Sequence, residues 1–424
     1  MRTVVQKFGG SSLATVDQIR RVADRVARDH RAGHRMVVVV SARGGSTDEL
    51  LALAAAVGGG VASQGAREVD QLLATGECAS AALLALALRG IGVPAVSLTG
   101  AQAGIIATGD HGAGVVERVC PRRLRRVLAA GSIAVVAGFQ GIGRAGDVLT
   151  LGRGGSDTTA VALAAALGTS RCEIYTDVAG VFTADPRLVE RARVYTGLSA
   201  RVTFELASAG ARVLHARCVA LAERHGTDIY VAHAASRDRG TLVRGTPTAG
   251  SERRCAAVGV AHDTDAARIV VTRPGGSGVA DLAAEILALL AVQEVPADMV
   301  SAGGSAFAFT VRASVVDGLR GPLRALAGAA SRIIVDDRAA KVSLVGVGLL
   351  DQPRPAVRMI TALRGVGLDP SGLSLSHHRA CATVRRDRVA DAVRALHEEF
   401  EDDFASEFGA DALRPSHHER SVAS

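Results

Sequence analysis

Short apolar runs alternate with amphipathic stretches through the first half of the chain, and this alternation restricts the fold more than any other feature. Met36–Val40 and Ile133–Ala137 are continuous apolar runs, as expected of strands that are buried on both faces. Before the first of these runs, residues 15–33 have helical spacing, with Ile19 and Val22 on one face. The repeated order of strand and helix predicts an α/β sandwich with a largely parallel sheet.

A change of composition divides the chain near residue 246. Thr246–Arg254 gathers Pro, Gly, Ser and charged residues, and it is expected to be a linker. Two shorter strand–helix–strand units follow, and each begins with a β-rich segment, Ile269–Thr272 in one and Lys341–Val347 in the other. This parallel predicts a weak internal duplication, and the polar end of the chain is expected to be frayed. The expected divisions are 1–245, 246–254, 255–338, 339–405 and 406–424.

Composition and charge exclude several classes of function for the 424-residue chain. Its net charge is +7, but the basic residues are dispersed and aromatic residues make up only 3%, which argues against a nucleic-acid partner. The sequence does not open like a secretory signal and has no run of about 18 uncharged apolar residues, so no membrane span is expected. The six cysteines are scattered without a CxxC pair, which favours a reduced cytoplasm over a disulfide framework or a zinc site.

Lysine is nearly absent from the chain, and one of its two lysines lies in a glycine-rich turn. Lys7 and Lys341 are the only lysines among 49 Lys and Arg residues, and Lys7 precedes Phe8, Gly9 and Gly10. A lysine places a compact charge on a flexible stem, whereas arginine offers a flat fork. Glycines let a backbone approach a ligand closely, and N–H groups at a helix start attract anions. The turn therefore favours a phosphate site, although an ordinary strand–helix turn has the same outline.

A second glycine-rich segment, Thr150–Thr159, adds one arginine and one aspartate to a helix start. Arg153 is suited to a bidentate contact with a carboxylate. Ser156 is a plausible N-cap, and the backbone donors around it can hold an anion. Asp157 can orient a cation or receive a lysine. These residue types together favour a binding loop over a plain connecting loop.

A third segment, Tyr175–Arg187, follows a buried strand and so lies at a strand's carboxyl end, where open α/β sheets bind ligands. Asp177 can accept a hydrogen bond from a ribose or a base, and Arg187 can meet a phosphate. Two nucleotide-binding patterns are not supported: Gly141–Gly146 matches GxGxxG but opens no clear helix, and no GxxxxGK[ST] sequence exists. The paired histidines, His377-His378 and His417-His418, have no further metal-ligating residues at a suitable spacing, so no metal site is expected.

In this order the three segments resemble the amino acid kinase family, and specifically its aspartate kinases (aspartokinases). The resemblance covers nearly the whole chain and extends to Thr75–Glu77 and Gly138–Gly141. It implies the amino acid kinase fold, a three-layer α/β/α sandwich with a mostly parallel sheet, as a catalytic domain over 1–245. Two ACT-like βαββαβ units would follow. The implied substrates are ATP and L-aspartate, because acetylglutamate, glutamate 5- and uridylate kinases share the fold but not this series of motifs.

The resemblance also implies roles for individual residues, in which Glu77 suits the ammonium of aspartate and Arg153 a carboxylate. The catalytic group would comprise Lys7, Ser41 near the reacting phosphate, and Asp157, which would orient Lys7. The ATP site would comprise Lys7, Phe8, Gly9, Gly10, Thr176, Asp177, Phe182, Asp185, Arg187 and Arg212. The aspartate site would comprise Ser41, Thr47, Glu77, Arg153, Gly154, Gly155 and Ser156. The family has a lysine where Arg212 stands, so the charge of that contact is kept and its geometry is not.

The implied reaction transfers the γ-phosphate of ATP to the β-carboxylate of L-aspartate and gives 4-phospho-L-aspartate, the first step toward lysine, threonine and methionine. A carboxylate with a pKa of about 4 is already ionised at neutral pH, so its attack needs no general base. Repulsion between anions is the obstacle, and Lys7, the glycine N–H groups and the Mg²⁺ carried by ATP would neutralise it. Two alternatives stay open: a kinase for another acidic or small amino acid, and a non-catalytic amino acid sensor that kept the fold.

The C-terminal units depart from the family pattern where an effector would bind. The family's DMIxQN-like strand end reads Asp298–Gly303 here, without the Gln-Asn pair, and its Ser-Glu-Ile strand reads Ser376-His377-His378. The loop that usually carries an acidic residue before Lys-Pro-Gly reads Thr272–Gly276. The hypothesis is weakened or altered feedback by lysine and threonine, as would suit a paralogue in a specialised pathway. ACT units usually pair across a two-fold axis, so a homodimer or a higher homo-oligomer is expected.

Overall fold

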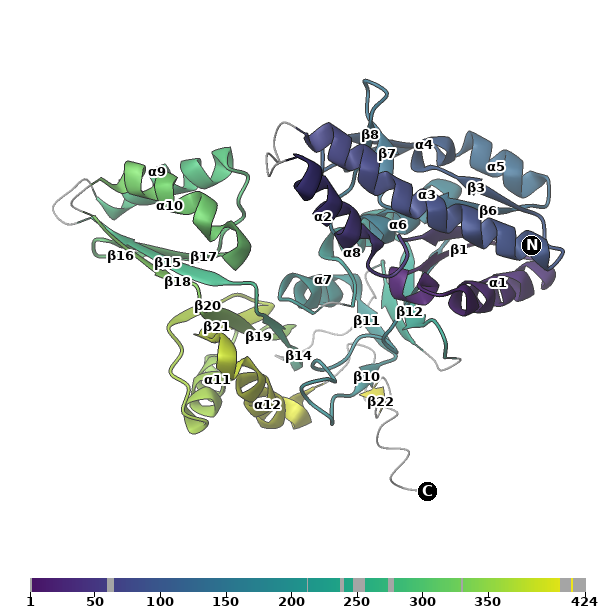
Figure 1. Ribbon diagram of the computed structural model, residues 1–424. Coiled ribbons are helices and arrows are strands. Elements are labelled where there is room, and N and C mark those ends of the chain that lie inside the picture. The colour runs from purple at the N-terminus through teal and green to yellow at the C-terminus, as the bar shows by residue number, and fades with distance from the viewer. Residues whose placement is uncertain are drawn as a thin grey trace.

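The computed structural model describes residues 2–58, 65–211, 213–236, 240–246, 256–273, 278–328, 331–404 and 413–414. Figure 1 shows an N-terminal domain, coloured purple to teal, and two smaller α/β units, coloured green to yellow. Arg212, residues 274–277 and most of the expected linker and tail lie outside the described residues.

An eight-stranded sheet forms the middle layer of the N-terminal domain, in the order β11-β13-β12-β9-β1-β2-β6-β3. Its strand pairs are parallel except for β12 with β13, so the predicted mostly parallel sheet is confirmed. The strands are β1 (Thr3–Phe8), β2 (Arg35–Val40), β3 (Ala95–Leu98), β6 (Ile133–Ala137), β9 (Arg171–Thr176), β11 (Gly197–Ser199), β12 (Asp228–His233) and β13 (Thr241–Arg244).

Helices cover both faces of this sheet, which completes the predicted three layers (Figure 1). Alternate residues of β2 enter different cores: Val39 packs on the side of α5, α6 and α8, and Val38 on the side of α1 and α3. The continuous apolar run therefore reflects burial on both faces. The helices of the domain are α1 (Val16–Arg31), α2 (Ser46–Gly58), α3 (Ala66–Gly90), α4 (Gly100–Ala103), α5 (Arg122–Ala129), α6 (Gly155–Leu167), α7 (Ala200–Ser208) and α8 (Ala216–His225).

The long helix α3 is a core helix of this domain. Among the helices in the described ranges, it alone is long and apolar enough to cross a membrane by length and composition. Its apolar side chains Leu73, Leu84 and Leu88 are buried in the folded chain, however, and its polar residues Asp70 and Glu77 are buried with them. A buried core helix can have the same length and apolar composition as a membrane span, so these two properties of α3 are weak evidence that it crosses a membrane.

A small four-stranded sheet with the order β5-β4-β7-β8 stands beside the carboxyl edge of β6. Its last strand ends at Thr150 and leads directly into the second glycine-rich segment. The strands are β4 (Ile105–Thr108), β5 (Val115–Val119), β7 (Gln140–Ile142) and β8 (Val148–Thr150). Elsewhere in the domain, β10 (Val194–Tyr195) pairs with β22 (Leu413–Arg414) near the chain end.

The two C-terminal units each combine a four-stranded antiparallel sheet with two helices. The first unit has the order β16-β17-β15-β18 and the second the order β14-β19-β21-β20. The first unit contains β15 (Ala267–Thr272), α9 (Val279–Val292), β16 (Asp298–Gly303), β17 (Ala306–Val311), α10 (Val316–Ala327) and β18 (Arg332–Asp336). The second unit contains β14 (Ala256–Asp263), β19 (Ala339–Val347), α11 (Arg354–Gly365), β20 (Gly372–Leu375), β21 (Arg379–Arg385) and α12 (Val389–Phe400).

Strand β14 connects the N-terminal domain with the C-terminal units in a way that its position in the sequence does not indicate. It lies within the range 255–338 that the sequence assigned to the first unit, but it pairs with β19 of the second. The first unit is therefore an insertion between two strands of the second unit's sheet. Val258 of β14 and Val345 of β19 also share an apolar cluster with Leu206 of α7. The second unit thus packs directly on the N-terminal domain.

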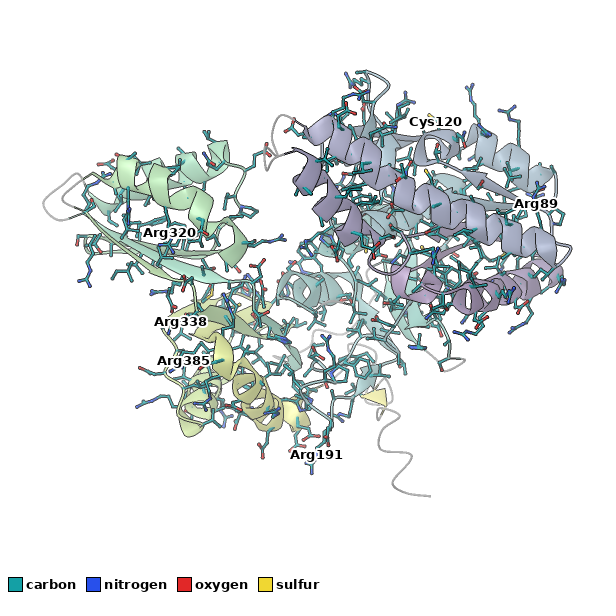
Figure 2. All side chains as sticks on the ribbon, in the orientation of Figure 1. Arg89, Cys120, Arg191, Arg320, Arg338 and Arg385 are labelled. Atoms are coloured by element: carbon teal, nitrogen blue, oxygen red, sulfur yellow. The ribbon has the colours of Figure 1, made fainter. Side chains whose placement is uncertain are left out.

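Arginine side chains occur on the N-terminal domain and on both C-terminal units. Figure 2 shows Arg89 on the N-terminal domain, Arg320 on the first unit and Arg385 on the second, well apart from one another.

Candidate active site

The three sequence motifs meet at the carboxyl edge of the central sheet. Because β9, β1, β2 and β6 are parallel neighbours, the loops that follow them open on the same edge. Backbone hydrogen bonds connect these loops: Gly9 N–H donates to Tyr175 O at 3.2 Å, Ser41 N–H to Phe8 O at 3.2 Å, and Gly138 N–H to Val40 O at 2.9 Å.

Lys7 and Asp157 form an ion pair at the centre of this edge. Lys7 Nζ lies 2.6 Å from Asp157 Oδ1, and the two side chains are only 11% and 13% exposed. Lys7 comes from β1 and Asp157 from the first turn of α6, so the contact joins two of the three motifs. The ammonium also points toward Gly9, since a Cβ on Gly9 would lie 3.7 Å from Nζ. The contact that the sequence allowed between this aspartate and a lysine is present.

Two glycines let the loops approach closely enough to form the site. A Cβ on Gly10 would lie 2.4 Å from Ala42 O, and a Cβ on Gly138 would lie 2.7 Å from Ser156 Oγ. Any larger residue would push these segments apart. Gly10 begins a short 3-10 helix, Gly10–Leu13, and Ser156 lies in the first turn of α6. The first N–H groups of α6 therefore face the same space as the Lys7 turn and can attract an anion.

Glu77 brings a buried carboxylate to the site from α3. Its Oε1 accepts a hydrogen bond of 3.0 Å from Ala42 N–H, in the segment that follows Ser41. Its Oε2 is buried and has no hydrogen-bond partner in the described part of the chain. Burial raises the pKa of Glu77 to about 7, against the hydrogen bond from Ala42, which lowers it. A cationic ligand such as an ammonium would satisfy the free oxygen.

Arg153 stands exposed on a loop that its neighbours hold rigidly. Its side chain makes no hydrogen bond or ion pair within the described ranges, so it is free to meet a ligand. The loop is held by Arg217, which donates to Leu151 O at 2.5 Å and to Gly114 O at 2.9 Å. Gly154 takes a left-handed conformation with φ 70° against the His215 ring. Burial lowers the pKa of His215, and the charge of Arg217 lowers it further.

The residues expected around the nucleotide fall into two groups. Thr176 and Asp177 follow β9 at the site edge, where Thr176 Oγ1 donates to Asp177 Oδ1 at 3.0 Å. Arg187 lies farther along the chain, and its guanidinium donates to both carboxylate oxygens of Asp185, with Nε 3.0 Å from Oδ1 and Nη2 2.7 Å from Oδ2. Burial alone would raise the pKa of Asp185, but the hydrogen bonds and charge of Arg187 bring it below its usual value. Phe182 packs against the apolar core of the second unit.

The remaining expected contacts lie near the centre of the site. Ser41 and Thr47 are half-buried on the loop after β2 and on the first turn of α2. Ser156 is buried, and Gly154 and Gly155 form the start of α6. Phe139 was not singled out from the sequence. It has a positive φ of 67° and packs beside Gly155, where a Cβ would lie 2.9 Å from its ring. A non-glycine residue in this conformation after a buried strand is a structural signal that the sequence alone does not give.

Comparisons with known proteins match this geometry to one family. A family model described as the amino acid kinase family matches residues 2–233, and one described as an ACT domain matches residues 342–400. The aspartokinase of Mycolicibacterium smegmatis is 42% identical over 410 residues, covering 94% of this chain and 96% of that one. An aspartokinase of Thermus thermophilus is 39% identical over 414 residues, covering 96% of this chain and 100% of that one.

Solved structures give the same result. The structure of aspartokinase III from E. coli in complex with aspartate and ADP has a TM-score of 0.82 at 25% identity, covering 95% of this chain and 100% of that one. The structure of aspartate kinase from Synechocystis has a TM-score of 0.53 at 37% identity, covering 95% of this chain and 69% of that one. The likeness therefore spans the N-terminal domain and both C-terminal units.

Proposed function

The chain belongs to the aspartokinases of the amino acid kinase family and is an ATP-dependent aspartate kinase, and we propose that it transfers the γ-phosphate of ATP to the β-carboxylate of L-aspartate. The observation that carries this proposal is the Lys7–Asp157 ion pair between the Gly9–Gly10 turn and the start of α6. We propose the residue roles and the divisions of the chain as the sequence assigned them, with β14 counted in the sheet of the second unit.

Aspartate would lie between Glu77 and Arg153. The free Glu77 Oε2 offers a buried anionic contact for the ammonium, and Arg153 offers an unoccupied guanidinium for a carboxylate. Ser41, Thr47 and Ser156 would contribute hydroxyl groups to this site. The similar E. coli aspartokinase III has been solved in complex with aspartate and ADP, which supports the binding of both ligands by a chain of this fold.

The phosphate groups of the nucleotide would lie over the Gly9–Gly10 turn. Asp157 holds the Lys7 ammonium there, and the N–H groups at the start of α6 add positive potential. The attacking carboxylate is ionised at neutral pH, so the residues have only to orient two anions and neutralise the charge that develops between them. Mg²⁺ would enter as the magnesium salt of ATP and would neutralise part of the phosphate charge.

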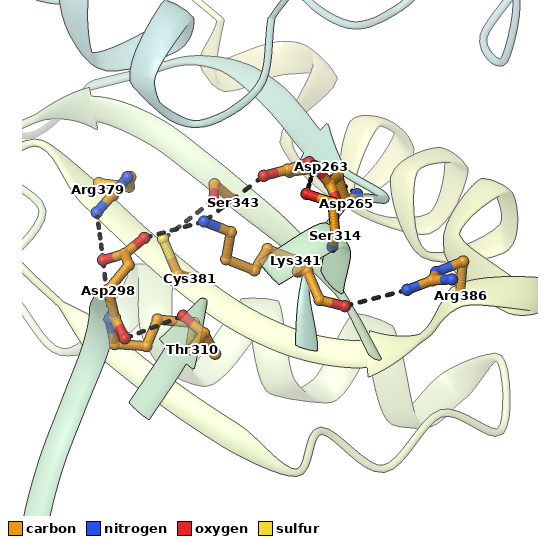
Figure 3. Close-up of polar contacts among 12 residues, drawn as sticks. Asp263, Asp265, Asp298, Thr310, Ser314, Lys341, Ser343, Arg379, Cys381 and Arg386 are labelled. Carbon is orange, nitrogen blue, oxygen red and sulfur yellow. Dashed lines mark hydrogen bonds and ion pairs between the residues drawn. The ribbon is translucent and has the colours of Figure 1, made fainter. Parts of the chain in front are cut away.

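Regulation would differ from that of relatives that sense lysine at their ACT units. One E. coli aspartokinase III structure is a complex with lysine and aspartate, and we propose that feedback is weakened or altered here. Asp298, at the start of the segment that lacks the Gln-Asn pair, is already engaged by Lys341 and Arg379 (Figure 3). Alanine and glycine follow in place of amide side chains that could hold an amino acid. We also propose a homo-oligomer and a cytoplasmic enzyme.

An ADP-release assay with MgATP and L-aspartate, in which hydroxylamine traps the acyl phosphate, tests the proposed reaction. Aspartate-dependent hydroxamate from the wild type, lost in Lys7→Ala, would support it. Well-folded protein that forms no hydroxamate would instead point to another acceptor or to a sensor. The same assay with lysine, threonine and both tests the regulation: strong inhibition by low concentrations of the two together would contradict altered feedback.

A further inference from the structure

We infer that Asp70 is a positioning residue that fixes the spacing between Glu77 and Arg153, and so sets the length of amino acid that the site accepts. Asp70 lies on α3 and is only 1% exposed. Its Oδ2 accepts from Thr150 N–H at 2.9 Å and from Gly112 N–H at 3.1 Å, and Oδ1 accepts from Thr150 Oγ1 at 2.5 Å. His111 Nδ1 lies 3.1 Å from Oδ2 as well. The Asp70 carboxylate therefore binds both the loop around Gly112 and the loop that begins at Thr150.

These contacts tie the Arg153 loop to α3. Thr150 ends β8, three residues before Arg153. The loop around Gly112 packs directly under the same turn: Gly114 N–H donates to Thr150 O at 2.8 Å, and a Cβ on Gly152 would lie 3.1 Å from Gly112 O. Both segments that support Arg153 are thus fixed to the same buried carboxylate.

The same helix carries the other end of the proposed aspartate site. Asp70 and Glu77 are seven residues apart on α3, which is two helical turns or about 10 Å, and both lie on its buried face. α3 therefore sets the distance between the two ends of the proposed site. Glu77 lies at the ammonium end, and Asp70 fixes the loop that presents Arg153 at the carboxylate end. The Arg153 side chain makes no hydrogen bond or ion pair in the described ranges, so its position depends on the backbone that Asp70 and Arg217 hold.

A carboxylate is needed at position 70 for this purpose. Its two oxygens can accept from several donors at once, whereas an amide has only one accepting oxygen. Removing one oxygen leaves a buried donor unpaired and lets the Thr150 end of the loop move. A looser Arg153 loop should weaken aspartate binding and should discriminate less well against an amino acid that is one methylene longer.

The test is steady-state kinetics of Asp70→Asn with L-aspartate, L-glutamate and MgATP. The inference rests on the proposed aspartate site, so aspartate-dependent turnover of the wild type is established first, and its absence would defeat the proposed function rather than this inference. We expect KM for aspartate to rise about tenfold or more, with kcat and KM for ATP changed less than about threefold, and the preference for aspartate over glutamate to fall.

Asp29→Asn is the matched control. Asp29, on α1, accepts a hydrogen bond of 2.7 Å from the side chain of the buried Gln6, and this contact is remote from the Arg153 loop. The substitution should lower the unfolding temperature without changing KM for aspartate. Thr150→Val removes only the hydroxyl donor to Asp70, and it replaces Asp70→Asn if that variant does not fold. An unchanged KM for aspartate, or a rise in both KM values in proportion to lost stability, would overturn the inference.

Discussion

Lys341 Nζ lies 3.2 Å from Asp298 Oδ2, and this ion pair joins β19 of the second unit to β16 of the first (Figure 3). Lys341 also lies 3.7 Å from Asp263 at the end of β14, and Arg379 of β21 donates to Asp298 Oδ1 at 3.1 Å. Strands from both sheets therefore meet at Asp298. Each of the two lysines in the chain pairs with an aspartate: Lys7 in the proposed active site, and Lys341 between the C-terminal units.

The Asp298 contact predicts an acid-dependent stability. Burial alone would raise the pKa of Asp298, but the charges of Lys341 and Arg379 bring it below its usual value. A carboxyl whose pKa is lower in the folded state stabilises above its unfolded pKa, and this contribution is lost as the pH falls through about 4 and below. Asp298→Asn should thus cost about 1–3 kcal/mol at pH 7 and much less at pH 3.

Thermal unfolding of the wild type and of Asp298→Asn across this pH range provides the measurement. Asp351→Asn is the control, since Asp351 is largely exposed and, among the described residues, its carboxylate pairs only with His377, at 3.7 Å. A destabilisation by Asp298→Asn that is equally large at pH 3 and pH 7 would contradict the ion-pair explanation.

The Lys7 ammonium should not be replaceable by a guanidinium. Lys7→Arg keeps the charge, but the pair with Asp157 is nearly buried and has little room for a planar fork. We expect kcat to fall by about a hundredfold or more in Lys7→Arg, and turnover to be lost in Lys7→Ala, with the fold intact. Hydroxamate formation and circular dichroism measure the two effects. Lys341→Arg is the matched control and should keep its activity; near-normal activity of Lys7→Ala would reject the assignment.

Sequence patterns were sufficient to predict that the glycine-rich segments meet at one edge of the sheet. The uninterrupted apolar run of β2 indicated burial on both faces and hence a parallel sheet, and parallel neighbours place the loops that follow them on one edge. Lys7 and Asp157 are therefore brought together although they are far apart in the chain. The glycine-rich composition of both segments marked the close approach that Gly10 requires.

Other relationships depend on long-range packing that local patterns do not encode. Asp70 looks in the sequence like one polar residue of a helix, and its partner Thr150 is 80 residues away. β14 pairs with β19 although the whole first unit lies between them in the chain. The spacing of apolar residues predicts where a strand lies but not which strand it pairs with. Phe182 packs against the core of the second unit, another contact between segments far apart in the chain, and its role beside the nucleotide stays a prediction.

Gly10 should tolerate no side chain. In Gly10→Ala the new Cβ would lie 2.4 Å from Ala42 O, so the Lys7 turn or the loop after β2 has to move. We expect a loss of about 1–3 kcal/mol in the free energy of unfolding and a higher KM for ATP. Gly45→Ala is the control in the same loop region, because a Cβ on Gly45 would meet no described atom within 4 Å. Equal effects of the two substitutions would show that the close approach at Gly10 has no special role.

Glu77 should make aspartate binding depend on pH near neutrality. Burial raises the pKa of Glu77 to about 7 from its usual 4.5, so the free protein is partly protonated there at neutral pH. Only the ionised form attracts an ammonium, so kcat/KM for aspartate should fall as the pH drops below about 7. Glu77→Gln keeps an acceptor for Ala42 N–H and should bind aspartate weakly at every pH, with no such fall. A wild-type profile that is flat between pH 6 and pH 8 would contradict this role.

The raised pKa of Glu77 also affects the stability of the free protein, and here ionisation is unfavourable. A group whose pKa is higher in the folded state contributes most below its unfolded pKa, and this contribution is lost as the pH rises from about 4.5 to about 7. Glu77→Gln should therefore unfold at a higher temperature than the wild type at pH 8, and the difference should shrink toward pH 4. Saturating aspartate should stabilise the wild type more than the variant, because the ammonium compensates the buried charge. Thermal unfolding with and without aspartate tests whether the Glu77 carboxylate serves ligand binding or the stability of the fold. If Glu77→Gln is less stable than the wild type at pH 8, Glu77 serves the fold.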